Sequence, residues 1–231
     1  MKRTHKVWRS VVAIAPLVVA LIILFQHPNL YQPVTPPAAT ESLQATGEAT
    51  DILNQLEVKG RAPKTDYNRD QFGDGWESRQ GCDTRNTILR RDLVNVVMNA
   101  ECKVVSGTLH DPYTGKDVMF TRGDTTSDDV QIDHVVALSD AWQTGAQQLT
   151  REERVNLAND PLELLAVEGQ SNQQKSDGDA ATWLPSNKVF RCQYVARQIA
   201  VKQKYRLWVK STEKDAMIRV LAGCPGQQLP V

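Results

Sequence analysis

Residues 130–138, VQIDHVVAL, place an aspartate and a histidine side by side inside an otherwise apolar, β-branched segment. Such a composition predicts a short buried strand. Neighbouring side chains of a strand point to opposite faces, so either Asp133 or His134 is buried unless a bulge or the strand end re-aims both. Burying these groups is costly without polar partners, which the rest of the chain must therefore supply. Taken alone, the Asp-His pair fits a structural role as well as a chemical one.

The N-terminus is predicted to be an export segment. Residues 1–25 contain four basic residues and no acid, and the basic residues precede an apolar run over residues 11–25. That run is slightly short for a membrane span, which needs about 17–25 residues, and its bulky end offers no convincing cleavage site. We expect a secreted or cell-surface protein, either released or held by an uncleaved anchor. Residues 26–40 are expected to be a linker and residues 41–231 a single domain.

Four cysteines lie in the predicted domain, and none forms a CxxC pair; they are Cys82, Cys102, Cys192 and Cys224. Without that tight spacing a zinc ribbon is disfavoured, and an even number in an exported chain predicts two disulfides. Three pairings are possible. We favour Cys82–Cys102 with Cys192–Cys224, because each pair brackets one predicted supersecondary unit.

The hydrophobic patterns predict an α+β fold with a helical surround. Apolar periodicity predicts helices over residues 41–58, 83–99, 150–158, about 189–199 and about 217–224. The turn DPYTG predicts a β-hairpin between residues 103–109 and 118–121. A capping box, Thr150 with Glu153, opens the helix at 150, and residues 159–161 must stop it. A second short strand is expected over residues 162–167, and a short helix follows it.

Charge restricts the possible partners. Residues 26–231 carry 23 basic and 27 acidic residues, a net charge of −4, which excludes a uniformly cationic nucleic-acid binder. Residues 111–179 have a net charge of −9 and residues 187–219 a net charge of +7. This division suits a metal site beside a polyanion-binding face, but ordinary solvated helix surfaces explain it equally well.

Several catalytic motifs are absent, including HExxH, a G-x-S-x-G elbow and a P-loop. The predicted domain has only two histidines. His110 is expected at the surface of the hairpin. His134 lies in the Asp-His strand, which is followed by a helix, Asn159, a second strand and a short helix with Asn172 and Lys175. This order brings a carboxylate, an imidazole and a carboxamide to one end of a strand pair.

That set of groups suits phosphodiester hydrolysis. A neutral His134 imidazole can take a proton from water. Oxygen ligands from Asp133 and Asn172 can hold a hard divalent cation, which relieves negative charge on the phosphate. Asn159 can fix the imidazole, and Lys175 can contact a phosphate.

These segments, IDHVVAL, ANDPLELLAV and SNQQKSD, resemble the HNH (ββα-metal) nucleases. More closely, about residues 50–224 resemble a family of exported actinobacterial HNH proteins whose domain also occurs at the C-terminus of GmrSD-type restriction enzymes. Matching stretches include GRAPKTDYNRDQFGDGW, GCDTRN, DPYTGK and TWLPSN. The resemblance implies a ββα-metal core at about residues 130–180. It also implies His134 as general base, Asp133 and Asn172 as metal ligands, and Asn159 as the residue that orients His134.

The same resemblance places Lys175 at a basic position of the motif, and Arg85 is a further candidate for phosphate contact. A structural salt bridge explains Arg85 equally well. Asn172 stands where the third letter of HNH can be histidine; its amide oxygen favours Mg²⁺ or Mn²⁺ over zinc. Trp183 is expected in the core or at its rim rather than as a base-stacking platform.

We therefore expect a metal-dependent endonuclease that acts outside the cytoplasm, with DNA favoured as substrate and RNA as the alternative. A second class is a non-catalytic exported envelope or nucleic-acid-binding protein on the same scaffold. A third is an envelope hydrolase of a phosphate-free polymer, for which the spacing assembles neither paired carboxylates nor a zinc triad.

Overall fold

The structure, a computed structural model, describes residues 47–79 and 81–230. The predicted export segment and linker, residues 1–40, lie outside the described residues, as does the start of the helix predicted from residue 41. In the described part of the chain no helix combines the length and apolar character that a membrane crossing requires.

The described residues form an α+β fold, as predicted. Its helices are α2 (Glu48–Gln55), α3 (Thr84–Asp92), α4 (Leu138–Gln143), α5 (Arg151–Ala158), α6 (Gly169–Lys175), α7 (Arg191–Lys204) and α8 (Ser211–Leu221). Its strands are β1 (Ser78–Arg79), β2 (Cys82–Asp83), β3 (Leu93–Met98), β4 (Val104–His110), β5 (Asp117–Thr121), β6 (Val130–His134) and β7 (Leu164–Glu168). Short 3₁₀ turns are η2 (Arg69–Phe72), η3 (Ser127–Asp129), η4 (Ala146–Gln148) and η5 (Lys188–Phe190).

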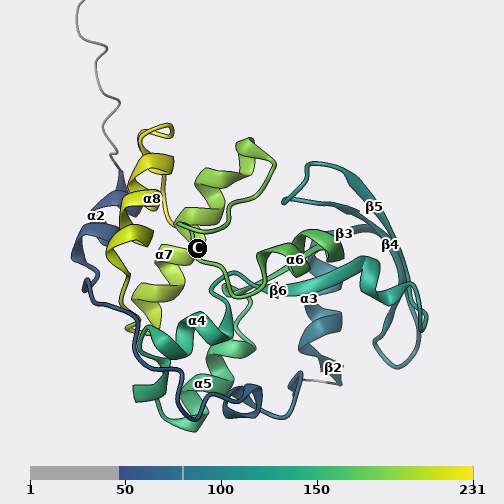
Figure 1. The fold of residues 1–231 in the computed structure, drawn as a ribbon. Helices are drawn as coiled ribbons and strands as arrows, with labels where there is room; N and C mark the ends of the chain where they lie inside the picture. Colours follow the sequence, from purple (N-terminus) through teal and green to yellow (C-terminus); the bar gives the residue numbers. More distant parts are fainter. Residues whose placement is uncertain (1–46, 80, 231) are drawn as a thin grey trace, which may run out of the picture. The chain divides into compact units, whose positions relative to one another are not determined.

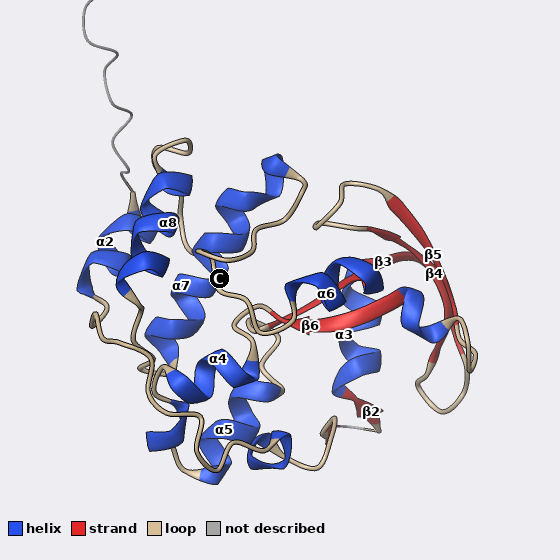
Figure 2. Ribbon diagram, in the orientation of Figure 1, coloured by secondary structure: helices blue, strands red, loops and turns tan. Residues whose placement is uncertain are grey.

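Helices gather on one side of this unit and the sheet β3–β4–β5 lies on the other, with β6 and α6 between them (Figures 1 and 2). Strands β6 and β7 pair antiparallel, with Asp133 opposite Leu165 and His134 opposite Leu164. Helix α6 begins directly after β7 and packs against both strands. The order strand, strand, helix is the ββα arrangement expected at about residues 130–180.

The β6–β7 pair is buried on both faces. Leu164 and Ala166 of β7 join the core beneath the three-stranded sheet, together with Val130 and Ile132 of β6. The alternate β7 residues join the larger helical core; they are Leu165 and Val167. This double burial explains why β7 is a continuous apolar run from Leu164 to Val167, and why the apolar residues Val130 and Ile132 of β6 are buried as well. It also places Asp133 and His134, on opposite faces, each inside a packed layer.

One predicted helix was wrong in its second half. The helix expected over residues 83–99 ends at Asp92, and β3 follows at once. Its residues Val94, Val96 and Val97 are β-branched, and β3 pairs antiparallel with β4, with Leu93 opposite Leu109. Backbone pairing with the neighbouring hairpin therefore overrides the helical spacing of these apolar residues.

The other predicted elements are present with shifted ends. The hairpin around DPYTG is β4–β5. The Thr150–Glu153 capping box opens α5, which stops before Asn159. The strand expected over residues 130–138 ends at His134, and the strand expected from residue 162 begins at Leu164.

Two disulfides join the favoured cysteine pairs. Cys82 pairs with Cys102, with their Cα atoms 5.3 Å apart, and Cys192 pairs with Cys224 at 6.3 Å. The first joins the β1–β2 hairpin to the turn between β3 and β4. The second joins α7 to the end of α8. They close loops of 20 and 32 residues in sequence separation.

We predict that reduction destabilises the protein. Loops of this size are each worth about 3–4 kcal/mol in the chain-entropy description, which corresponds to roughly 6–16 °C in Tm per disulfide for a domain of this size. Thermal unfolding with and without dithiothreitol measures the change. A variant with all four cysteines replaced by serine is the control and should not respond to dithiothreitol. An unchanged Tm of the native protein would contradict the prediction.

Candidate functional site

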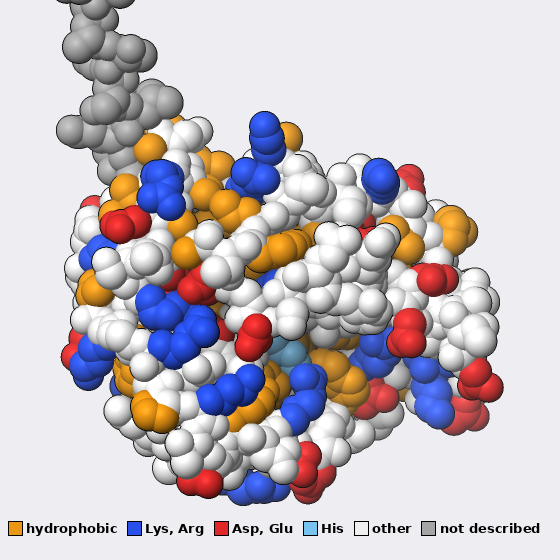
Figure 3. All heavy atoms as spheres, viewed as in Figure 1, with side chains coloured by type: hydrophobic (Ala, Val, Ile, Leu, Met, Phe, Trp, Pro, Cys, Tyr) orange, Lys and Arg blue, Asp and Glu red, His pale blue; other side chains and the backbone are white. Residues whose placement is uncertain are grey.

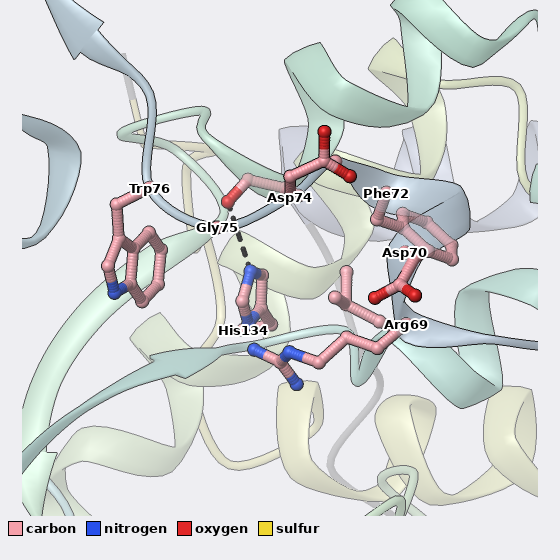
Figure 4. Close-up of a pocket in the computed structure, with 10 residues that line it drawn as sticks. Arg69, Asp70, Phe72, Asp74, Gly75, Trp76 and His134 are labelled. Carbon is pink, nitrogen blue, oxygen red and sulfur yellow. Dashed lines mark hydrogen bonds between the residues drawn. The ribbon is translucent and has the colours of Figure 1, made fainter.

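The His134 imidazole is fixed at the end of β6. Its Nε2 lies 3.0 Å from the carbonyl oxygen of Ala158, the last residue of α5. The Trp76 indole stacks on the ring, with centroids 5.6 Å apart and planes 7° apart. Figure 4 shows the stacked rings and the hydrogen bond. A carbonyl only accepts hydrogen bonds, so Nε2 carries the proton and Nδ1 is the bare nitrogen. Within the described residues Nδ1 has no hydrogen-bond partner.

The environment keeps this imidazole neutral. Burial lowers the pKa of His134 from 6.5 to about 3, and the positive charge of Arg69 adds to the effect. The Ala158 carbonyl acts in the opposite direction but does not offset burial. A neutral imidazole with a bare nitrogen is a proton acceptor near neutral pH.

Asp133 is buried on the other face of β6. Its Oδ1 accepts from Lys175 Nζ at 2.9 Å, and its Oδ2 accepts a hydrogen bond from the Tyr113 hydroxyl. Burial raises the pKa of the Asp133 carboxyl, while Lys175 and the hydrogen bond from Tyr113 favour the charged form. These are the polar partners that the sequence required for a buried aspartate.

Lys175 has a different position from the one expected of a phosphate ligand. Its side chain is fully buried, and besides Asp133 it donates to the carbonyl oxygen of His134 at 2.8 Å. The ammonium group thus neutralises Asp133 and ties α6 to the end of β6. The geometry makes it a structural counter-ion beneath the site rather than a surface contact for substrate.

Asn172 lies one turn before Lys175 on α6, at the rim of a groove of about 560 Å³. Its Nδ2 donates to Gln131 Oε1 at 2.9 Å. The Asn172 Oδ1 has no hydrogen bond among the described residues. Asp133, His134, Gln131 and Asn172 all line this groove, so the structure brings the predicted base and the predicted metal ligands to one place.

The Asn159 side chain does not contact His134. Its Oδ1 accepts from the backbone N–H of Glu77 at 3.0 Å, and its Nδ2 donates to the Val155 carbonyl at 3.0 Å. The group that orients His134 is instead the carbonyl oxygen of the preceding residue, Ala158, which accepts a hydrogen bond from Nε2. Asn159 therefore holds the residue next to Trp76, and its link to the imidazole is indirect.

Residues 69–76, which we call the strap, line the pocket beside His134 and pack against α5. Arg154 donates to the carbonyl and the side-chain oxygen of Gln71, at 2.9 and 3.0 Å. Phe72 is buried against Trp142. Gly73 has a φ of 106°, which favours glycine, and a Cβ there would lie 3.3 Å from a Val155 methyl group. These contacts fix the strap to α4 and α5 and so place Trp76 against His134.

Three basic side chains line the groove, namely Lys64, Arg69 and Arg85. On the face drawn in Figure 3, Lys and Arg side chains gather around a hollow in which a histidine is visible. Arg85, the predicted phosphate contact, donates to the carbonyls of Ser127 and Val130, both at 3.1 Å. Those bonds pack α3 against η3 and β6, so Arg85 borders the groove while serving the fold.

Sequence reasoning missed two residues of the site, Tyr113 and Arg69. Tyr113, in the DPYTG turn, was treated only as part of a hairpin, yet it is fully buried and bonds to Asp133. Asp111 explains how the turn reaches the site, because its Oδ1 accepts from Glu168 N at 2.9 Å. Arg69 lies in a polar, turn-rich stretch without periodicity, so nothing in its own segment singled it out. Trp183, expected in the core or at its rim, packs edge-on against Tyr113.

Comparison with known proteins adds a family. The model of the family "GmrSD restriction endonucleases, C-terminal domain" matches residues 83–220. A relative from Arthroderma benhamiae (strain ATCC MYA-4681 / CBS 112371), described as an uncharacterized secreted protein, is 37% identical over 193 residues. That alignment covers 82% of this chain and 89% of the relative. No solved structure matches the chain. The relative is fungal, and the narrower resemblance to actinobacterial proteins stays a prediction.

We predict that Lys175→Met lowers the free energy of unfolding by about 3–5 kcal/mol, because Asp133 is left as a buried charge without its partner. Urea denaturation measures the loss. Lys188→Met, at an exposed lysine, is the matched control. Adding Asp133→Asn to Lys175→Met should recover part of the stability. A loss below about 1 kcal/mol would contradict the structural role of Lys175 and favour the phosphate contact predicted from the sequence.

Proposed function

The chain belongs to the family of C-terminal domains of GmrSD restriction endonucleases, and from that premise we propose that it is an HNH-type endonuclease that hydrolyses phosphodiester bonds. The observation that carries the proposal is the state of His134. It is a neutral imidazole with Nε2 held by a carbonyl and Nδ1 bare, and it lines a groove with basic side chains.

The proposed reaction adds water across a P–O bond. The water oxygen bonds to phosphorus while one water proton passes to His134 Nδ1. The leaving oxygen departs with the bonding electron pair and is protonated by solvent. The fixed Nε2 bond keeps the imidazole in the tautomer that this step requires, and the stacked Trp76 restrains the ring.

The groove also fits a hard divalent cation. The oxygens of Asp133, Asn172 and Gln131 line it together. Among the described residues no three His, Cys, Asp or Glu side chains gather into a metal-binding cluster, so the amide oxygens would have to complete the ligand set. The Asp133 carboxylate already accepts hydrogen bonds from Lys175, Tyr113 and the backbone N–H of His134. An ionised carboxylate has about four lone-pair sites, so about one stays available to a cation.

We assign Asp133 and Asn172 as the residues that hold the cation, and Mg²⁺ or Mn²⁺ as its identity. Such ions keep several waters and need few protein ligands, which matches one carboxylate and one amide oxygen. When bound, the cation would stabilise negative charge that develops on the phosphate and the leaving oxygen.

The substrate proposed is nucleic acid, with DNA favoured and RNA as the alternative, and the place of action is outside the cytoplasm. The secreted description of the fungal relative and the two disulfides of this chain both support export. The positive charge of Arg69, which makes no hydrogen bond or ion pair among the described residues, supports a phosphate-bearing substrate.

We predict that the purified protein nicks plasmid DNA with Mg²⁺ or Mn²⁺, that EDTA stops the reaction, and that His134→Ala abolishes it without unfolding the protein. Gel analysis of supercoiled plasmid measures nicking, and circular dichroism checks the fold. His110→Ala, at the exposed histidine on β4, is the matched control and should cleave normally.

Full activity of His134→Ala would overturn the assignment of the base. A folded, oxidised wild-type protein that cleaves neither DNA nor RNA with any divalent metal would overturn the enzymatic function. The non-catalytic nucleic-acid-binding class would then take its place.

A second prediction concerns Asn159. Asn159→Ala removes the acceptor for the Glu77 N–H and should loosen Trp76 from His134, lowering kcat by about ten- to a hundredfold. Asn159→Asp keeps an acceptor oxygen and should retain most activity. Plasmid nicking gives the rates, and tryptophan fluorescence reports on the stacking. Equal loss in both variants, with unchanged fluorescence, would indicate direct contact between Asn159 and the reactants.

A further inference from the structure

Arg69 is the uncommitted cation of the site. Its side chain is exposed, and among the described residues its guanidinium makes no hydrogen bond or ion pair. It lines both hollows that border His134, the groove and a smaller pocket of about 270 Å³. Figure 4 draws the guanidinium beside the imidazole, and the two are close enough for the Arg69 charge to act on His134.

The other basic residues of the groove are already engaged. The Lys64 ammonium lies 3.7 Å from the Asp177 carboxylate and over the Tyr67 ring. Arg85 donates to two backbone carbonyls. Lys175 does not line the groove and is buried beneath it against Asp133. Arg69 is thus the basic side chain at His134 whose donors are available to a ligand.

The strap presents Arg69 from a fixed base. Arg69 opens η2, whose first turn is capped by Asn68 Oδ1 accepting from Asp70 N at 3.1 Å. Arg151 donates to the Asp70 carbonyl at 3.1 Å, and Arg154 holds Gln71. The backbone on the C-terminal side of Arg69 is therefore tied to α5, and the free guanidinium is the part that can move onto a ligand.

Charge along the strap indicates which side of His134 takes the ligand. The smaller pocket is lined by two carboxylates, Asp70 and Asp74, which repel an anion. The groove has three basic side chains, Arg69, Arg85 and Lys64, against two carboxylates, and it also contains the amide oxygen of Asn172. Those carboxylates, Asp133 and Asp177, are each paired with a lysine. A phosphodiester held by Arg69 in the groove would lie against both His134 and the proposed cation ligands.

We infer that Arg69 is a catalytic residue of the proposed nuclease, whose guanidinium donates to a non-bridging oxygen of the scissile phosphate. This inference rests on the proposed function and names a residue beyond the base and the cation ligands. The planar guanidinium suits a phosphate, because two parallel N–H groups can bind two of its oxygens. Negative charge on those oxygens grows during attack by water, so the contact strengthens in the transition state.

The test compares Arg69→Met, Arg69→Lys and Arg90→Met in the purified full chain. Arg90 is exposed on α3, does not line the groove and has no polar partner among the described residues, so Arg90→Met removes the same charge elsewhere. Arg69→Met should lower kcat/KM for DNA cleavage by about 10²–10³-fold, the effect of removing one transition-state donor. Arg69→Lys should recover part of the loss, and Arg90→Met should cleave like wild type.

A binding measurement separates a phosphate contact from a purely structural role. In the His134→Ala background, affinity for a short DNA is measured by fluorescence anisotropy over a range of salt concentrations. Arg69→Met should reduce the slope of log affinity against log salt by about one, and Arg90→Met should leave it unchanged. Urea denaturation of each variant checks that stability is preserved.

The outcomes distinguish the two proposals. If wild type cleaves and Arg69→Met cleaves as well as Arg90→Met, the role of Arg69 is overturned and the nuclease stands. If Arg69→Met loses activity with an unchanged salt slope and lower stability, Arg69 is structural and the inference is also overturned. If folded wild type cleaves neither DNA nor RNA, the proposed function fails and this inference fails with it.

Discussion

Burial of the β6–β7 pair on both faces is the constraint on which the site depends. On a strand pair with one wet face, whichever of Asp133 and His134 pointed to water would be hydrated at little cost, and nothing would fix its orientation. Here each side chain enters a packed layer and must be satisfied there. Lys175 and Tyr113 satisfy Asp133 from one side, while the Ala158 carbonyl and Trp76 hold His134 on the other. The partners that offset the cost of burying these two side chains therefore also fix their orientations.

Elements remote in sequence supply these partners, and each has a local reason to be where it is. Helix α5 starts at the Thr150 capping box and ends where its last carbonyl meets His134. The hairpin β4–β5 carries Tyr113 in its turn, and Asp111 joins that turn to the end of β7. The strap is anchored on α5 through Arg154. Preorganisation of this kind, rather than any single strong bond, is what a hydrolytic site needs.

The sequence was most informative where a residue conflicts with its surroundings. Two adjacent polar residues inside a largely apolar strand marked Asp133 and His134, and hydrophobic periodicity together with a capping box located the elements around them. The sequence was uninformative where the deciding group is a backbone atom or where tertiary contacts decide the conformation. The atom that orients His134 is a backbone carbonyl, one residue before the asparagine that was expected to do so. Residues 93–98 satisfy a helical and a strand period alike, and only pairing with β4 decides between them. Arg69 lies in irregular chain whose position is set by tertiary contacts.

The disulfide between Cys82 and Cys102 begins six residues beyond Trp76, so the covalent link lies next to the segment that presents Arg69 and Trp76 to the imidazole. Before oxidation, that segment is held by noncovalent contacts to α4, α5 and His134, and by the neighbouring hydrogen bond from Glu77 N–H to Asn159. A chain still inside the cell, where thiols stay reduced, therefore lacks part of the bracing of its own site. A chain that reaches an oxidising compartment gains this bridge, and with it both added stability of the domain and the full bracing of the segment beside His134.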